Sequence, residues 1–249
     1  MNLFKFIEVD KDFYWYHFPA PKGSNLGSSV FMITSGTECI LIDSAHTDQF
    51  KLVQKDILKR GLTIQKLIVT HYHPYHTGGI YVVDDVVGSS SAGETLQMFY
   101  DDFQHLMPDT PIDKETTLQF GNHTILLENN IGHSLCTLLI TLNDKYIFVG
   151  DDIITDNDGN LLMPFVAETL GEHISGVKRI SEVCEGKIIV PSHGIILRDS
   201  DKIKHHISAI LTYLNYVLND NTKTYAEFNR ETGIDLLNHG WHKSNMERD

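Results

Sequence analysis

The stretch that decides the fold is "IVTHYHPYHTGG", residues 68–79, in which three histidines lie close together between an apolar run and two glycines. Alternate residues of an extended segment point to the same side, so His71 and His73 can reach one point together. His76 follows a bend and can reach a neighbouring point. Neutral imidazole is the commonest metal ligand in proteins, so this spacing predicts two adjacent metal positions.

Three further candidate ligands follow other strand-like runs. "NNIGHSL" places His133 in a loop between two such runs, "YIFVGDD" places Asp151 after another, and "IIVPSHG" places His193 after a third. Functional groups are often presented where a rigid strand ends and a loop begins. We therefore expect these side chains to complete the site.

Strand-like and helix-like segments alternate along the chain. Strands are predicted over residues 28–34, 38–44, 66–70, 115–120, 123–129, 136–142, 145–151 and 187–193. Helices are predicted over residues 47–60, 92–106, 171–185 and 200–218, and the tail after residue 238 reads as polar and mobile. Strand clusters interleaved with helices favour two sheets sandwiched between helical layers.

Composition narrows the range of partners and compartments. The formal net charge of −13 disfavours nucleic acid or an anionic membrane as the main partner. No apolar run reaches the ~18 residues of a membrane span, and acidic residues interrupt the N-terminal segment, so no signal peptide is expected. Cys39, Cys136 and Cys184 form no CxxC pair, which suits a reducing compartment. We expect a cytoplasmic protein with a small-molecule substrate, and a homodimer is left open.

The ordered set "THYHPYH", "GHS", "GD" and "SHG" resembles the HxHxDH, H, D and H pattern of the metallo-β-lactamase superfamily. The earlier "ILIDS", which ends near Asp43, also resembles a strand of that superfamily. The resemblance covers about residues 28–195. It implies an α+β fold, an αββα sandwich with metals at one edge of the two sheets. Residues 1–199 would form this domain, and residues 200–249 would be its helical extension.

The resemblance also implies a ligand set. The first metal would take His71, His73 and His133. The second would take His76 and His193, and Asp151 would bridge both. One or two divalent ions are expected, with zinc preferred over iron or manganese. Asp43 is expected to accept a hydrogen bond from loop backbone or to orient a ligand histidine, and Asp152 to be a capping or surface acid.

Tyr75 departs from the pattern, because the superfamily has a metal-ligating aspartate at this position. A phenol, with a reference pKa of ~10, is a poor ligand until a cation lowers that value. Three interpretations stay open. Tyr75 ligates as phenolate, favouring iron; it stays protonated and donates a hydrogen bond to substrate or solvent; or the second position is weak or empty.

The function implied is metal-assisted hydrolysis of an ester, thioester, lactone or amide, with Asp151 and Tyr75 as catalytic residues. The chain resembles the glyoxalase II-like and lactonase-like hydrolases of similar length, but lacks the tyrosine and basic pattern expected for glutathione thioesters. One alternative is a mononuclear iron dioxygenase acting on a thiol or persulfide. Another is a non-catalytic member of the fold that binds metal or ligand.

The remaining histidines and some apolar residues are predicted to have no role in binding the metal. Solvated surface positions are expected for His205, His206, His239 and His242. Met163, Phe165 and Leu170 are candidates to line the substrate pocket, although such residues more commonly pack in the core.

Overall fold

The computed structural model describes residues 4–248. The first three residues and the last one, which belong to the N-terminal segment and the polar tail discussed above, lie outside the described part. The strands are β1 (Lys5–Asp10), β2 (Phe13–Phe18), β3 (Ser28–Ser35), β4 (Glu38–Ile42), β5 (Thr63–Ile68), β6 (Val86–Ser89), β7 (Thr110–Ile112), β8 (Thr116–Phe120), β9 (His123–Asn129), β10 (Leu138–Leu142), β11 (Tyr146–Phe148) and β12 (Ile188–Val190).

The helices are α1 (Thr47–Lys59), α2 (Ala92–Leu96), α3 (Leu170–Val183), α4 (Ser200–Asn219), α5 (Tyr225–Thr232) and α6 (Trp241–Asn245), with one 3₁₀ turn, η1 (Gln104–Leu106). None of the helices within residues 4–248 combines the length and the apolar content that crossing a membrane requires.

The strands form two sheets. The seven-stranded sheet has the order β1-β2-β3-β4-β5-β6-β7, and the five-stranded sheet has the order β12-β11-β10-β9-β8. Neighbours from β1 to β4 are antiparallel, whereas β4, β5, β6 and β7 are mutually parallel. In the second sheet β8 to β11 alternate in direction, and β12 runs parallel to β11.

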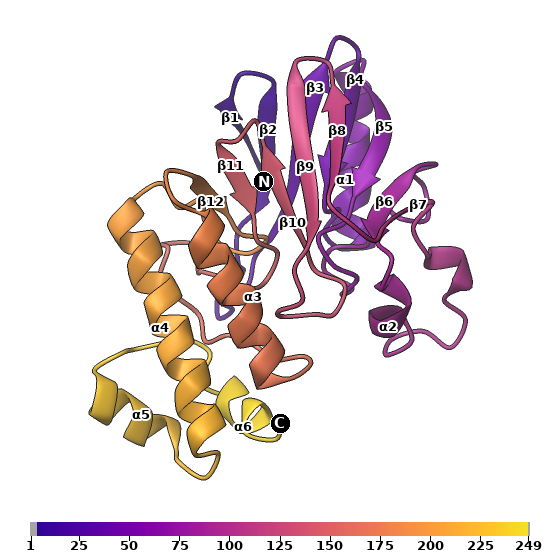
Figure 1. The fold of residues 1–249 in the computed structure, drawn as a ribbon. Coiled ribbons are helices and arrows are strands. Elements are labelled where there is room, and N and C mark those ends of the chain that lie inside the picture. The colour runs from indigo at the N-terminus through magenta and orange to yellow at the C-terminus, as the bar shows by residue number, and fades with distance from the viewer. Residues whose placement is uncertain (1–3, 249) are drawn as a thin grey trace.

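Side-chain alternation in the central strands explains the layers. In β4, Ile40 and Ile42 lie in the cluster between the two sheets, whereas Cys39 and Leu41 pack toward α1. Successive residues of a strand point to opposite faces, so a strand that is apolar on both faces needs a cover on each side. Helices α1 and α2 lie on the outer side of the first sheet, and α3 and α4 on that of the second (Figure 1). The predicted αββα sandwich is confirmed.

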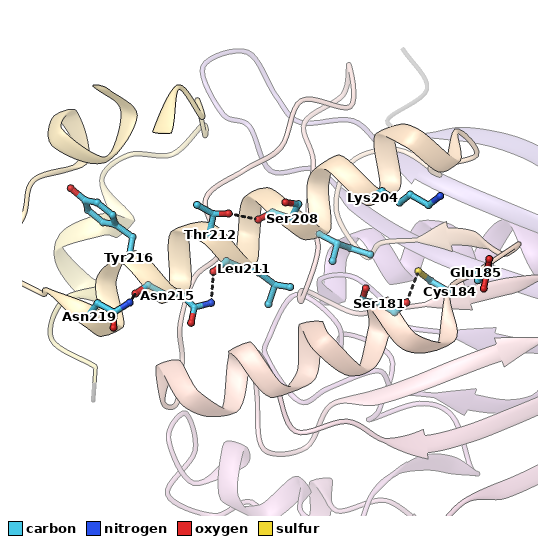
Figure 2. A pocket seen from close by; sticks show the side chains of 11 residues that line it. Ser181, Cys184, Glu185, Lys204, Ser208, Leu211, Thr212, Asn215, Tyr216 and Asn219 are labelled. Atoms are coloured by element: carbon cyan, nitrogen blue, oxygen red, sulfur yellow. Dashed lines mark hydrogen bonds between the residues drawn. The ribbon is translucent and has the colours of Figure 1, made fainter. Parts of the chain in front are cut away.

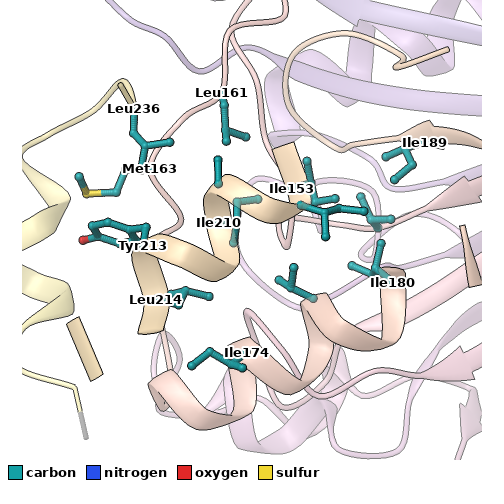
Figure 3. Close-up of a cluster of buried hydrophobic side chains, with 14 of the residues drawn as sticks. Ile153, Leu161, Met163, Ile174, Ile180, Ile189, Ile210, Tyr213, Leu214 and Leu236 are labelled. Carbon is teal, nitrogen blue, oxygen red and sulfur yellow. The ribbon is translucent and has the colours of Figure 1, made fainter. Parts of the chain in front are cut away.

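The C-terminal segment shares a core with the second sheet. Ile174 and Ile180 of α3 lie close to Ile210 and Leu214 of α4 (Figure 3), and the same cluster includes Leu139 of β10. Each buried aliphatic side chain of this kind contributes about 1.5–3 kcal/mol relative to exposure. Helix α4 begins at Ser200, as predicted, and is capped by the Asp199 carboxylate.

The helix predicted over residues 92–106 is wrong in extent. Helix α2 ends at Leu96, and only η1 returns to helical backbone. Leu106 is buried within η1, but the apolar residues between α2 and η1 lie outside any helix. Met98 and Phe99 are exposed, and the Phe99 ring instead lies edge-on at 5.5 Å from the His73 ring. Tertiary contacts therefore override the helical pattern here.

Candidate metal centre

The predicted ligands lie at one edge of the two sheets because of strand direction. The segment with His71, His73 and His76 follows the end of β5, and His133 follows the end of β9. Asp151 and His193 follow the ends of β11 and β12. Within the second sheet β9, β11 and β12 run in the same direction, since β12 pairs parallel to β11 and β10 lies antiparallel between β9 and β11, so their carboxyl ends share an edge. The structure brings the two edges, and all six predicted ligands, together.

Imidazole nitrogens surround the Asp151 carboxylate. Its Oδ2 lies 3.3 Å from Nε2 of His193 and 3.6 Å from Nε2 of His76. The distances to Nε2 of His71 and His133 are 3.8 and 3.9 Å. The His73 ring belongs to the same group through Nδ1, and not Nε2, because its Nδ1 lies 3.0 Å from Nε2 of His133. Five imidazoles and one carboxylate therefore converge on a small volume.

The outward-facing nitrogens fix the orientation of these rings. His133 Nδ1 donates to the carbonyl of Phe165 at 2.8 Å, and His193 Nδ1 donates to the carbonyl of Gly27 at 2.6 Å. A carbonyl can only accept, so each Nδ1 carries the proton and each Nε2 presents a lone pair to the centre. His71 Nδ1 lies 3.2 Å from the hydroxyl of Thr70.

Asp43 lies next to the candidate ligands and accepts hydrogen bonds from several of the segments that carry them. Its Oδ1 accepts from the backbone N–H of Thr70 at 2.8 Å, and its Oδ2 lies 2.9 Å from Nδ1 of His76. The hydroxyls of Thr70 and Ser192 also donate to Oδ2, each at 2.9 Å. Both roles predicted for Asp43, backbone acceptor and orienting partner of a histidine, are confirmed.

Asp152 was predicted to be a capping or surface acid, and the surface alternative is wrong. It is fully buried and accepts from the backbone N–H of His133 at 2.7 Å and from the side chain of Asn130 at 3.1 Å. Burial raises its pKa to about 7. Nε2 of the fully buried His173 lies 3.5 Å from its Oδ1. The prediction failed because a Gly-Asp-Asp run does not reveal that its second carboxylate turns inward beneath the His133 loop.

Comparison with known proteins agrees with this geometry. Residues 23–162, more than half of the chain, match the family model described as the metallo-beta-lactamase superfamily. The chain belongs to the metallo-β-lactamase superfamily. The recognition made from the histidine pattern is thereby confirmed.

Individual members of the superfamily are distant in sequence. An atrochrysone carboxyl ACP thioesterase from Pseudocercospora fijiensis is 23% identical over 197 residues, which cover 76% of this chain and 53% of that protein. A hydroxyacylglutathione hydrolase from Haemophilus ducreyi is 24% identical over 171 residues, which cover 66% of this chain and 64% of that protein. The chain spans about half the length of the thioesterases it matches. These names describe hydrolases, and they support a hydrolase in general.

Solved structures of the superfamily share the fold. The metallo-beta-lactamase from Pontibacter korlensis superposes with a TM-score of 0.69 at 19% identity, covering 84% of this chain and 98% of that one. At this identity the likeness shows the shared fold alone.

Burial and neighbouring charges set the protonation states of the candidate metal ligands. Burial lowers the pKa of His133 to about 3 and of His73 to about 4, and holds that of His71 well below its usual value. For His76, burial is outweighed by the Asp43 and Asp151 carboxylates, which raise its pKa to about 10. Burial alone would raise the pKa of Asp151, but the facing His193 and His76 hold it well below its usual value.

The donor set fits a divalent metal ion. Ligand atoms of His71, His73 and His133 lie within 4.8 Å of one another, as do those of His71, His76 and Asp151. Within residues 4–248, Nε2 of His71, Nε2 of His76 and Oδ1 of Asp151 are buried without a hydrogen-bond partner. Leaving a buried polar atom unpaired costs about 1–3 kcal/mol. A cation held by these groups would satisfy all three atoms.

A pocket of about 370 Å³ opens onto the centre. Its lining residues are Leu26, His73, Pro74, Tyr75, Phe99, His133, Asp151, Ile154, Phe165, His193 and Trp241. Of the apolar candidates named from the sequence, Phe165 lines this pocket, whereas Met163 and Leu170 lie in the core between helices and sheet. A larger hollow of about 840 Å³ between α3 and α4 (Figure 2) has none of the predicted ligands among its lining residues. The smaller pocket is therefore the candidate substrate site.

Tyr75 lies on the pocket wall. Its side chain is 44% exposed, and its ring lies 4.2 Å from the ring of His46 and 5.8 Å from that of His193, centroid to centroid. His46 precedes α1 and was not predicted as a site residue, although its imidazole lies against the ring of Tyr75.

Two of the remaining histidines are not solvated as predicted. His205 and His239 are exposed, as expected. His206 is buried, with Nε2 at 3.2 Å from the carbonyl of Gly159, and His242 is buried, with Nδ1 at 3.0 Å from the hydroxyl of Tyr213. The tail was predicted to be mobile, but its residues 241–245 form α6, which docks against α4 through hydrogen bonds of His242 and Asn245 with Tyr213.

Proposed function

We propose that this chain is a metal-dependent hydrolase that cleaves an ester, thioester, lactone or amide bond of a small molecule. The observation that carries the proposal is the convergence of five imidazoles on the Asp151 carboxylate at the floor of an open pocket. Perturbed titratable groups gathered in a pocket are characteristic of catalytic sites.

The residues divide into two ligand groups. His71, His73 and His133 would hold one ion, and His76, His193 and Asp151 would hold a second. Nitrogen and carboxylate donors suit zinc, and iron or manganese would also accept them. When bound, such an ion lowers the pKa of water and polarises a carbonyl oxygen.

Asp151 and Tyr75 are the residues to which we assign catalytic roles. Asp151 is ionised at neutral pH, so its carboxylate can orient the attacking water and accept a proton from it. Tyr75 faces the pocket, and its hydroxyl is assigned as a hydrogen-bond donor to the substrate. The aromatic and aliphatic walls limit access of bulk water to the reacting carbonyl.

Replacing Asp151 tests this assignment. Asp151→Asn should lower kcat/KM by about 10²–10⁴-fold on esters, thioesters or lactones, because an amide cannot take up the proton. Asp113→Asn makes the same change at an exposed position and should leave turnover unchanged. Circular dichroism and the melting temperature report whether the variants stay folded. Full activity in a folded Asp151→Asn enzyme would refute the assignment.

Three wider expectations belong to the same proposal. We propose a small-molecule substrate rather than nucleic acid or membrane lipid, and a cytoplasmic location. Association into a homodimer is open to direct measurement by analytical ultracentrifugation.

A further inference from the structure

The last helix of the chain reaches the substrate pocket. Trp241, the first residue of α6, lines the pocket together with Phe165, which precedes α3. Their rings meet edge to face, with centroids 5.7 Å apart and planes inclined at 69°. Such a pair forms a rigid apolar wall, because each ring limits the rotamers of the other.

Asn245 at the end of α6 fixes the segment that carries Phe165. Its side chain is fully buried. Its Nδ2 donates to the carbonyl of Pro164 at 2.7 Å, and its Oδ1 accepts from the backbone N–H of Val166 at 3.0 Å. The Asn245 side-chain amide is therefore hydrogen-bonded to the backbone on both sides of Phe165. The hydroxyl of Tyr213 accepts a further bond from Nδ2 at 3.0 Å.

Phe165 connects this wall to the metal centre. Its carbonyl oxygen accepts the hydrogen bond from Nδ1 of His133 at 2.8 Å. The ring of Phe165 thus shapes the pocket, while its backbone orients a ligand. A shift of the Phe165 segment would alter both together.

The chemistry of the lining indicates what the pocket accepts. Leu26, Phe99, Ile154, Phe165 and Trp241 supply aliphatic and aromatic surface. None of its lining residues among those described is a lysine or an arginine, and the carboxylate in the lining is Asp151. Away from the metal centre, a substrate carboxylate placed against this lining would have to give up its hydration without a cationic side chain to pair with.

We propose that the substrate carries an uncharged, apolar acyl group beside the scissile carbonyl, and that Trp241 and Phe165 form the wall that recognises it. Asn245 is the positioning residue that holds this wall. The inference rests on the proposed hydrolase function and adds the substrate class to it. A volume of about 370 Å³ lies at the lower end of small-molecule sites and suits an alkyl or aryl group of moderate length.

A binding experiment without turnover tests the recognition itself. The chain has two tryptophans, Trp241 in the pocket wall and Trp15 in the core between the sheets. Titration with 2-nonanone should change the tryptophan fluorescence saturably, and Trp241→Phe should remove that change. The matched anionic probe 8-oxononanoate should bind at least about 10-fold more weakly. Equal or tighter binding of the anion, or no saturable change with either ketone, would overturn the inference.

A hydrolytic series tests the wall. Trp241→Ala should lower the ratio of kcat/KM for p-nitrophenyl octanoate over p-nitrophenyl acetate by about 10-fold, chiefly through KM for the octanoate. Tyr81→Ala removes an exposed aromatic ring outside the pocket and should leave that ratio unchanged. The half ester of suberic acid, equal in length but carboxylated, should be a poorer substrate than the octanoate. An unaltered ratio in Trp241→Ala would contradict the inference.

Asn245→Asp tests the positioning role. The substitution keeps the acceptor for Val166 but places a carboxylate against the carbonyl of Pro164. We expect the octanoate preference to fall and the dissociation constant for zinc to rise by about 10-fold, because His133 loses its fixed orientation. The control is Asn143→Asp. Asn143 follows β10 at the edge of the second sheet opposite the metal centre, where its side chain hydrogen-bonds to Thr124 and His123. This substitution should change neither the octanoate preference nor the zinc affinity. A variant with lowered melting temperature but unchanged preference and zinc affinity would show a structural role alone.

Different results would refute the hydrolase function and the apolar substrate class. Binding of 2-nonanone without hydrolysis of any ester, thioester or lactone would refute the hydrolase function and leave the apolar pocket standing. Hydrolysis that favours the carboxylated ester would refute the substrate class and leave the hydrolase function standing.

Discussion

Oδ2 of Asp43 lies 2.9 Å from Nδ1 of His76, and Oδ2 of Asp151 lies 3.6 Å from Nε2 of the same ring. The imidazole is held between two carboxylates, one outside the centre and one within it. The outer carboxylate also accepts hydrogen bonds from Thr70 and Ser192, so its position is fixed independently of the histidine. His76 therefore reaches the centre in one orientation.

Replacing the outer carboxylate should weaken metal binding. Asp43→Asn should raise the dissociation constant for zinc by about 10–100-fold, because a neutral amide orients His76 less strongly. Competition with a chromophoric chelator measures this constant. Ser192→Ala removes one hydrogen bond to the same oxygen without touching an imidazole, and its effect should be several-fold smaller. Wild-type affinity in Asp43→Asn would show that the contact does not support the site.

The strand ends made most of the centre predictable from the sequence. His71, His73, His133, Asp151 and His193 each follow an apolar run closely enough for the local pattern to locate them. The layers were predictable because the central strands are apolar on both faces, which requires a cover on each side.

Contacts between distant segments were not predictable in the same way. Asp152 and His206 are polar residue types whose burial depends on loops that pack over them from far along the chain. Trp241 and Asn245 belong to a short polar segment that carries no periodic signal, yet α6 docks against α4 and the pocket. Local patterns report which residues are apolar and give no information on which loop covers a given side chain.

Two substitutions at Tyr75 separate the three interpretations of this position. Tyr75→Phe should leave the metal content unchanged and lower kcat by about 10-fold, the effect of losing one hydrogen bond to the substrate. Tyr75→Asp should strengthen binding of a second ion, because it adds a carboxylate next to His76. Elemental analysis and steady-state kinetics measure both. Loss of metal from Tyr75→Phe would show that the phenol is a ligand and refute its assignment as a donor.

Gly78 should tolerate no side chain. A Cβ at this position would lie 2.4 Å from backbone atoms of His46 and Thr47, so Gly78→Ala must displace the loop that carries the histidines. We expect a loss of about 2 kcal/mol or more in the free energy of unfolding. Gly171→Ala lies on α3 with no atom within 4 Å of the added Cβ, and should stabilise by about 0.5–1 kcal/mol. Urea denaturation distinguishes the two, and equal effects would contradict the packing account.

The metal-free protein should lose stability in acid. Burial lowers the pKa of His133 to about 3 and of His73 to about 4, from about 6.5 in the unfolded chain. The unfolded state therefore binds more protons between pH 6.5 and 4, and the free energy of unfolding falls as the pH falls through this range. The raised pKa of Asp152, about 7, acts in the opposite direction, as does that of His76, about 10, above pH 6.5, but the depressed histidines outnumber these two groups. Urea denaturation of chelator-treated protein from pH 7 to 4.5 measures the trend, and stability that rises toward acid would contradict it.

The metal content per chain tests the central claim most directly. His71 offers a ligand atom within 4.8 Å of those of His73 and His133 and also of those of His76 and Asp151, whereas His205 is an exposed histidine on α4. After loading with zinc and gel filtration, elemental analysis should find one or two ions per chain in the wild type and in His205→Gln, and strongly reduced occupancy in His71→Gln. Wild-type protein that stays metal-free after loading with zinc, ferrous iron or manganese would contradict the account.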